Sequence, residues 1–172
     1  HLYIDSWTDD PTAVNRNVYF GEARSGVATS SDVIGSKNTI SYFCAQCHGI
    51  FHSGAGDEGL LDDDADVMDA TTNPWVRHPV DFTMPNTGEY VNYTTYNVNV
   101  PVASPTVQTS AAHNTAISGG TERIVMCLSC HRAHASDYGA IMRWDPDTIR
   151  ANNGTSTAGC FACHSKVDDN AI

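Results

Sequence analysis

The sequence has few lysines, few large aliphatic residues and no long apolar run. Lys37 and Lys166 are its only lysines, and the formal net charge is −11. Because nucleic-acid backbones and anionic membrane surfaces attract basic proteins, we expect neither nucleic acid nor a membrane surface as a partner. No apolar run reaches the roughly 18 residues of a membrane-spanning helix, so we also expect no membrane span.

The scarcity of aliphatic residues argues against an ordinary hydrophobic core. Leu, Ile, Val and Phe together make up fewer than one in five of the 172 residues. At that level, burial of side chains hardly offsets the entropy lost on folding. We therefore expect a non-protein group to fill part of the interior. The chain begins at His1 without an initiator Met or a signal segment, which we interpret as an exported chain whose leader has been removed.

All cysteines lie in three CXXCH units, which leaves none for a structural disulfide. The units contain Cys44, Cys47, Cys127, Cys130, Cys160 and Cys163, and each ends in a histidine, namely His48, His131 and His164. This spacing is typical of c-type haem attachment, in which two thiols bond to the haem and the histidine ligates its iron. Zinc is the competing interpretation, but zinc-binding CXXC pairs usually come as two separated pairs. The sequence therefore predicts three covalently bound c-type haems.

Five histidines remain as sixth ligands for the three irons: His1, His52, His78, His113 and His134. His52 follows its unit's histidine by four residues and His134 follows His131 by three, so on a helix each would share a face with its neighbour. Neither can reach the far side of its own haem, because the proximal histidine lies between. We therefore expect His52 and His134 each to ligate a different haem and to bring two haems close together.

The third sixth ligand is open between three histidines. We expect His78, which precedes the stiff Pro79 and follows an arginine, Arg77, that could meet a haem propionate. His113 lies in a Ser/Ala/Asn-rich stretch that we expect to be an exposed loop, and His1 is the first residue, so each is an alternative. Ligation by two histidines leaves no vacant iron position and favours electron transfer over catalysis.

The sequence predicts little regular structure. Residues 1–40 read as turns and short extended pieces, a short helix is expected around Cys44 to His48, and residues 90–100 alternate as a strand would. Helices are expected over residues 121–136 and from Asp137 to Trp144, ending before Pro146. Residues 57–69 are acidic and read as a solvated face, with a calcium site as the alternative.

We accordingly expect a mostly irregular fold with short α-helices and a few short strands, in one compact domain wrapped around covalently attached haems. Within it, residues 1–40 form an N-terminal arm that is a candidate subunit contact. Residues 41–172 form a three-haem cytochrome c domain.

Several segments resemble the doubled-CXXCH multihaem cytochromes of prokaryotic cell exteriors. The resemblance covers roughly residues 40–166 and is carried by "FCAQCHGIFH", "PWVRHPVDF", "GEY", "VMCLSCHRAHAS", "RWD" and "GCFACHS". Some members polymerise into extracellular filaments, often called microbial nanowires. The resemblance implies bis-histidine haems in a continuous stack, with His48, His131 and His164 proximal and His52, His78 and His134 distal. Four-haem relatives carry a further N-terminal CXXCH that this chain lacks, and His1 is a candidate ligand for a neighbouring subunit's haem.

The function that this resemblance implies is electron transfer by the repeating subunit of an extracellular or cell-surface filament. The partners would be copies of the chain joined head to tail, together with redox proteins or extracellular electron acceptors. Two alternatives remain: a soluble periplasmic electron shuttle, although many of these are rich in lysine, and a multihaem oxidoreductase with one open haem. We do not expect an enzyme, because spare histidines exceed the open iron positions.

Overall fold

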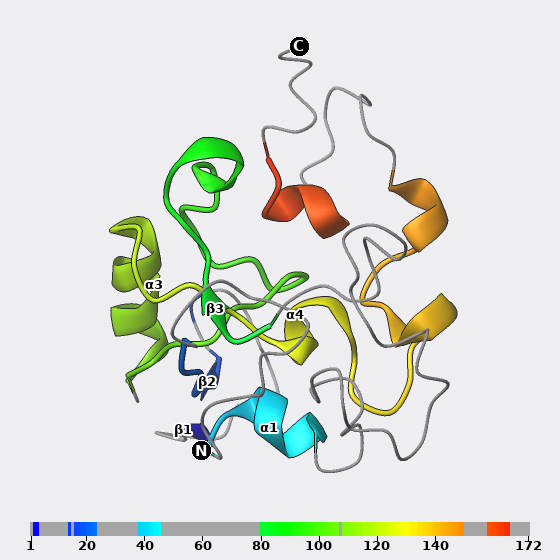
Figure 1. Cartoon of the computed structure of the whole chain (residues 1–172), viewed down its shortest axis with the longest axis horizontal. Coiled ribbons are helices and arrows are strands. Elements are labelled where there is room, and N and C mark those ends of the chain that lie inside the picture. Colours follow the sequence, from blue (N-terminus) through cyan, green and yellow to red (C-terminus); the bar gives the residue numbers. More distant parts are fainter. Residues whose placement is uncertain are drawn as a thin grey trace, which may run out of the picture.

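The computed structural model describes residues 2–3, 14, 16–23, 38–45, 80–106, 108–149 and 158–165. Its α-helices are α1 (Ile40–Ala45), α3 (Ser110–Ser118) and α4 (Cys127–Cys130). Short 3-10 helices are η2 (Gly88–Tyr90), η3 (Gly139–Ile141), η4 (Pro146–Thr148) and η5 (Gly159–Ala162). The described part of the chain is mostly loop (Figure 1), which confirms the expected mixture of short helices and strands. No helix in the described ranges is long and apolar enough to cross a membrane.

Two small antiparallel pairs supply the regular strands. β1 (Leu2–Tyr3) pairs with β2 (Val18–Tyr19), and β3 (Phe82–Thr83) pairs with β4 (Ile124–Val125). Ala103 and Ser104 connect the two strand pairs. Ala103 forms a β-bridge with Ile124 of β4, and Ser104 forms one with Phe20, the residue after β2. Gly21 lies at the tightest point: a Cβ added there would stand 2.7 Å from the Ala103 Cβ. The absence of a side chain lets these backbones approach each other.

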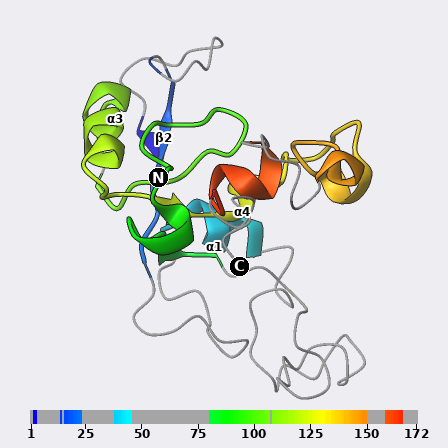
Figure 2. The ribbon, with the colours of Figure 1, turned by 90° about the horizontal axis from the view of Figure 1, so that it is seen from above.

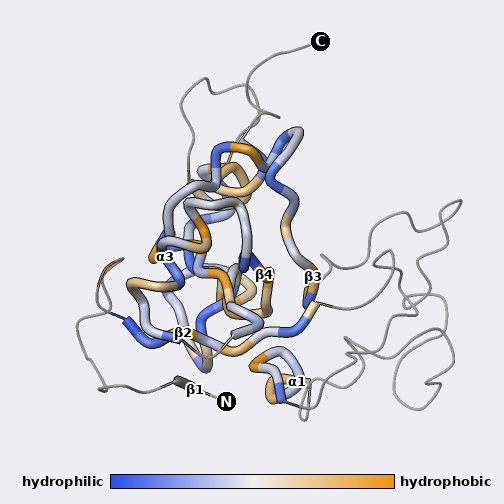
Figure 3. The backbone as a smooth tube through the Cα atoms, turned by 90° about the vertical axis from the view of Figure 1, so that its left-hand side faces the viewer, coloured by the Kyte–Doolittle hydropathy of each residue, from blue (hydrophilic) through white to orange (hydrophobic). Residues whose placement is uncertain are grey.

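The described residues form two small hydrophobic clusters along these extended segments. One contains Met84, Tyr93, Val102, Ile117 and Val125, and the other contains Ala103, Ile124, Met126 and Leu128. Successive residues of a strand point to opposite faces, which explains why Val102 and Val125 join one cluster while their neighbours join the other. Figure 3 shows apolar residues scattered along the backbone between polar ones, as the low aliphatic content requires.

The predicted strand over residues 90–100 is wrong. The segment starts in η2 and continues as turns, held by the Tyr93 hydroxyl, which donates to the Val100 carbonyl at 2.7 Å. Asn97 adds a local turn, since its side-chain oxygen accepts from the Asn99 amide at 2.9 Å. Asn side chains compete with strand pairing in this way, and here they prevail over the period-2 pattern.

The two predicted helices after residue 120 are also wrong over most of their length. Residues 121–136 contain β4 and the single turn α4, because Ile124 and Val125 pair with β3. Of the stretch from Asp137 to Trp144, only η3 is helical. Pro146 does not merely stop a helix but begins η4, where Asp145 caps the turn by accepting from the Asp147 amide.

Helix α3 was not expected from the sequence. Thr109 caps its first turn, because its side-chain oxygen accepts from the Ala112 amide. The helix buries His113 and Ile117, each 0% exposed, so the expectation that His113 lies in an exposed loop is wrong.

Val14 and residues 16–21 contact the rest of the described chain. The Ser110 hydroxyl donates to the Val14 carbonyl at 2.7 Å, and the buried Arg16 reaches His113 of α3. The expected division of the chain at residue 40 stays a prediction.

Candidate functional site

The second CXXCH unit is built on α4. A one-turn helix places Cys127 and Cys130, three residues apart, on the same side. Ser129 stabilises the start of the turn, because its hydroxyl accepts from the Met126 amide at 3.0 Å. Leu128 and Ser129 face the interior, whereas both cysteines are half-buried. The buried residues Leu128 and Ser129 therefore anchor α4, and its two half-buried cysteines lie on one side of the helix.

Helix α1 brings the first unit against the second. Figures 1 and 2 show α1 beside α4, and the thiols of Cys44 and Cys127 share a hydrogen bond that lowers the pKa of Cys44 and raises that of Cys127. Cys44 and Cys127, which are separated by about half the chain, thus lie side by side. Helix α1 confirms the expected short helix as far as Ala45. Cys47, His48 and His52 lie outside the described residues.

The third unit is carried by η5 and rests on the loop that follows the second unit. Gly159 has a positive φ of 57°, and a Cβ there would lie 2.6 Å from Ile149 Cδ1 and 2.9 Å from Trp144 Nε1. Glycine is therefore required both by backbone conformation and by close packing. Cys160 is exposed, whereas Cys163 packs against the core cluster around Tyr93, where burial raises the pKa of its thiol to about 12.

His131 is held through one ring nitrogen. Its Nδ1 donates to the Ala140 carbonyl at 2.9 Å, and its backbone bridges to Met142. The returning segment is fixed by Arg143, which donates from Nε to the Leu128 carbonyl and from its amide to the Cys130 carbonyl. In the described part of the chain Nε2 of His131 makes no hydrogen bond. A hydrogen bond donated by Nδ1 fixes the tautomer in which Nε2 can bind a metal.

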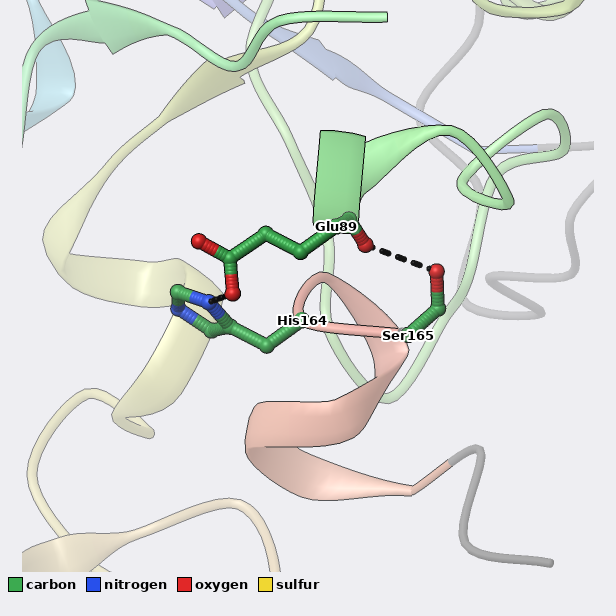
Figure 4. A network of polar contacts seen from close by, with 3 residues as sticks. All are labelled: Glu89, His164 and Ser165. Carbon is green, nitrogen blue, oxygen red and sulfur yellow. Dashed lines mark hydrogen bonds and ion pairs between the residues drawn. The ribbon is translucent and has the colours of Figure 1, made fainter. Parts of the chain in front are cut away.

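His164 is held in the same way by a different kind of acceptor. Figure 4 shows its Nδ1 pointing to the carboxylate of Glu89, at 2.8 Å from Oε2. Ser165 adds a second link, since its hydroxyl donates to the Glu89 carbonyl at 2.8 Å. The Tyr90 ring lies beside the imidazole, with centroids 5.1 Å apart. The hydrogen bond from His164 lowers the pKa of Glu89, which keeps this carboxyl ionised.

His134 does not share a helical face with His131. Helix α4 ends at Cys130, and His131 already has extended backbone angles (φ −108°, ψ 151°). His134 is exposed and has a φ of 72°, a left-handed conformation that is uncommon outside glycine. The helical basis for pairing these two histidines is thus wrong, and ligation by His134 stays a prediction.

His113 uses both ring nitrogens inside the protein. Arg16 Nη2 donates to Nδ1 at 3.1 Å, and Nε2 donates to the Glu122 carbonyl at 3.0 Å. This pattern fixes the neutral ring with its proton on Nε2, and burial lowers the pKa of His113 to about 4. Tyr96 completes the cluster, with the Arg16 guanidinium 3.3 Å above its ring centroid. The arrangement describes a core histidine, and it leaves no lone pair for iron.

Arg123 is a buried cation with unused donors. It is 1% exposed, and Nη1 donates to the Tyr93 carbonyl at 2.8 Å. Within the part of the chain that the structure describes, Nε and Nη2 have no hydrogen-bond partner. Burial lowers its pKa, and the neighbouring Tyr93 and Cys163 oppose this effect. An unsatisfied buried guanidinium is costly unless an anion accepts its hydrogen bonds. A haem propionate at the third unit would be such an anion, so the residues here fit a covalently attached haem.

Other predicted site residues cannot be placed. His1 and His78, the candidate distal ligands, and the acidic residues 57–69, the alternative calcium site, lie outside the described ranges. Among the described residues, no three His, Cys, Asp or Glu side chains group as they would around a metal ion.

Sequence reasoning missed Glu89, Arg123 and the Ala140 carbonyl as partners of the CXXCH units. Glu89 lies in the "GEY" segment that carries part of the resemblance, which was the one available signal. A carbonyl partner and a buried arginine depend on how distant segments pack, and no local pattern indicates them.

One comparison with known proteins finds a match. The family model described as "Doubled CXXCH motif" matches residues 121–169, a stretch that contains the second and third units and less than a third of the chain. No curated protein and no solved structure matches. The match indicates a c-type cytochrome-like protein, and its CXXCH motifs imply covalently bound c-type haem.

Proposed function

We propose that this chain is a three-haem c-type cytochrome that transfers electrons as the repeating subunit of an extracellular filament. The observation that carries the cytochrome assignment is the pairing of the doubled CXXCH motif with fixed histidines. His131 and His164 each have Nδ1 bound to an acceptor, which presents the opposite nitrogen to a metal.

The residues of the CXXCH units perform three tasks in this proposal. Cys127, Cys130, Cys160 and Cys163, with Cys44 and Cys47 of the first unit, hold the cofactor covalently. His131 and His164 supply proximal ligands whose orientation is fixed before the cofactor binds. Bound haem supplies a reversible one-electron iron couple. Helix α1 packs against α4, which places Cys44 and Cys127, the first cysteines of two units, close together and favours electron transfer between the haems they would hold.

The six-coordinate state requires distal ligands, for which we propose His52, His78 and His134, with His1 as the candidate from a neighbouring subunit. The structure favours a core role for His113, as its ring nitrogens are engaged. Complete ligation supports electron transfer rather than catalysis.

The filament part of the proposal is supported by the resemblance of residues 40–166 and by the composition. The chain has about 57 residues per predicted haem, which leaves much of the protein to cover the cofactors and to contact neighbours. A head-to-tail contact that does not close on itself generates an open polymer.

Electron cryo-microscopy of the native, haem-loaded material tests this proposal. We expect filaments in which each iron has two histidine ligands. Compact monomers at high protein concentration would contradict the filament and favour the periplasmic shuttle. An iron with a single protein ligand would favour the oxidoreductase.

A further inference from the structure

We propose that Glu89 is a positioning residue for His164 and lowers the reduction potential of the iron that His164 ligates. The inference rests on the proposed function, because it requires a haem at the third CXXCH unit. It begins from a difference between two histidines with the same place in the motif. His131 donates Nδ1–H to a neutral backbone carbonyl, whereas His164 donates it to a carboxylate.

The protein holds Glu89 in place from several sides. It sits in η2, directly after Gly88, whose φ of 61° turns the chain. Ser165, the residue after His164, donates to the Glu89 carbonyl (Figure 4), so two hydrogen bonds join η2 to the end of the third unit. The Tyr90 ring packs beside His164. We call these three contacts, the hydrogen bonds from His164 and Ser165 to Glu89 and the packing of Tyr90 on His164, the clamp. They hold the Glu89 carboxylate at the His164 ring.

The electronic consequence follows from the charge of the acceptor. A carboxylate that accepts a hydrogen bond from Nδ1–H makes the imidazole a more basic ligand. A more basic ligand stabilises ferric over ferrous iron. A neutral carbonyl acceptor does so less. Glu89 is thus expected to disfavour the one-electron reduction of the iron at His164. Arg123, near Cys163, acts in the opposite direction, so the inference concerns the effect of Glu89 and not the order of the three potentials.

The test is spectroelectrochemical titration of the haem-loaded full chain and of Glu89→Gln. Glutamine keeps an oxygen that can accept from Nδ1 but removes the charge. We expect the midpoint potential of one of the three one-electron transitions to rise. The equilibrium between ferric and ferrous iron should change about tenfold, which corresponds to roughly 59 mV. The electron paramagnetic resonance signal of one ferric haem should change with it. The other two transitions should stay in place.

Three further variants separate the local effect from others. Glu22→Gln removes the same charge from an exposed position outside this clamp and should leave all three potentials nearly unchanged. Glu89→Asp keeps the charge and should largely restore the potential. Ser165→Ala loosens the clamp without touching the carboxylate and should give a smaller shift of the same sign.

The outcomes distinguish this inference from the proposed function. If the chain carries no covalent haem, both fail. If the haems are present but Glu89→Gln and Ser165→Ala match Glu22→Gln, only the role of Glu89 is overturned. If Glu89→Gln does not fold, an unchanged potential in Ser165→Ala overturns it, and an upward shift of one transition supports it.

Discussion

Arg123 is a buried cation whose surroundings would be stabilised by a bound anion. It is fully buried, yet two of its donor atoms, Nε and Nη2, have no hydrogen-bond partner among the described residues. Its position beside Cys163 is reflected in the mutual effects on their pKa values, since Arg123 lowers that of Cys163 against the larger effect of burial. A cation there compensates the charge that a haem carboxylate would bring to the third unit.

Replacing Arg123 by methionine should destabilise the haem-loaded protein by about 1–3 kcal/mol, because the bound carboxylate and the Tyr93 carbonyl both lose a donor. The loss of a nearby cation should also lower the potential of one haem. Urea unfolding and redox titration measure the two effects. Arg132→Met, at an exposed position beside His131, is the matched control. Equal behaviour of the two variants would contradict an anion at Arg123.

His113 makes the free energy of unfolding depend on pH. Burial lowers its pKa from 6.5 to about 4, so between these values the unfolded chain binds a proton that the folded chain does not. The free energy of unfolding therefore falls as the pH decreases from 6.5 to 4, by about 3 kcal/mol at the lower end. His113→Gln should lose this part of the slope, as measured by denaturant unfolding at several pH values.

The same variant tests whether His113 ligates iron. We expect His113→Gln to be less stable at pH 7 but to keep fully low-spin ferric haems. The appearance of high-spin iron would show that His113 is an axial ligand after all. An unchanged pH slope would show that its ring is charged or solvated in the folded protein.

At the level of secondary-structure elements, the third CXXCH unit depends on the contact between η5 and the loop before it. Trp144 and Ile149 pack where a Gly159 side chain would stand. Gly159→Ala should lower the free energy of unfolding by about 1–3 kcal/mol from backbone conformation alone. It should also reduce haem attachment at this unit. Thermal unfolding and the haem-to-protein ratio measure both. Gly139→Ala is the control, as a Cβ there has no atom within 4 Å; equal losses would contradict the packing argument.

The elements also show which structural features a sequence can predict. The CXXCH units and the predominance of loop follow from spacing and composition, which are local. The strand expected over residues 90–100 failed because Tyr93 and Asn97 form hydrogen bonds that favour turns. The helix expected over residues 121–136 failed because β4 pairs with β3, about 40 residues earlier in the chain. Helix α3 did have a local signal, a Thr109 cap before an alanine-containing segment, which the sequence reasoning passed over.

The candidate site shows the same division. Cysteine and histidine positions can be read from the motif, whereas the acceptors of His131 and His164 lie 9 and 75 residues away in the sequence. The pairing of His131 with His134 assumed a helix through both residues, whereas α4 ends at Cys130, before either of them. Tertiary packing decides these features, and no single-sequence pattern specifies it.

For the whole molecule, charge governs how copies can associate. The chain carries a net charge of −11, and haem propionates would add to it. Association of like-charged subunits should therefore strengthen as salt or divalent cations screen the repulsion. Sedimentation at increasing ionic strength measures this, with the dilute low-salt sample as reference. Dissociation on adding salt would contradict the prediction and indicate contacts between opposite charges.

Electron transfer by this chain requires that its three CXXCH units hold three covalent haems around a protein core that is otherwise small. Intact-mass spectrometry of the denatured chain, expressed with a c-type maturation system, tests it most directly, together with the pyridine haemochrome spectrum. We expect a mass increase of three haems that survives denaturation. A colourless chain with the mass of the bare polypeptide, or one that carries zinc at its thiols, would contradict it.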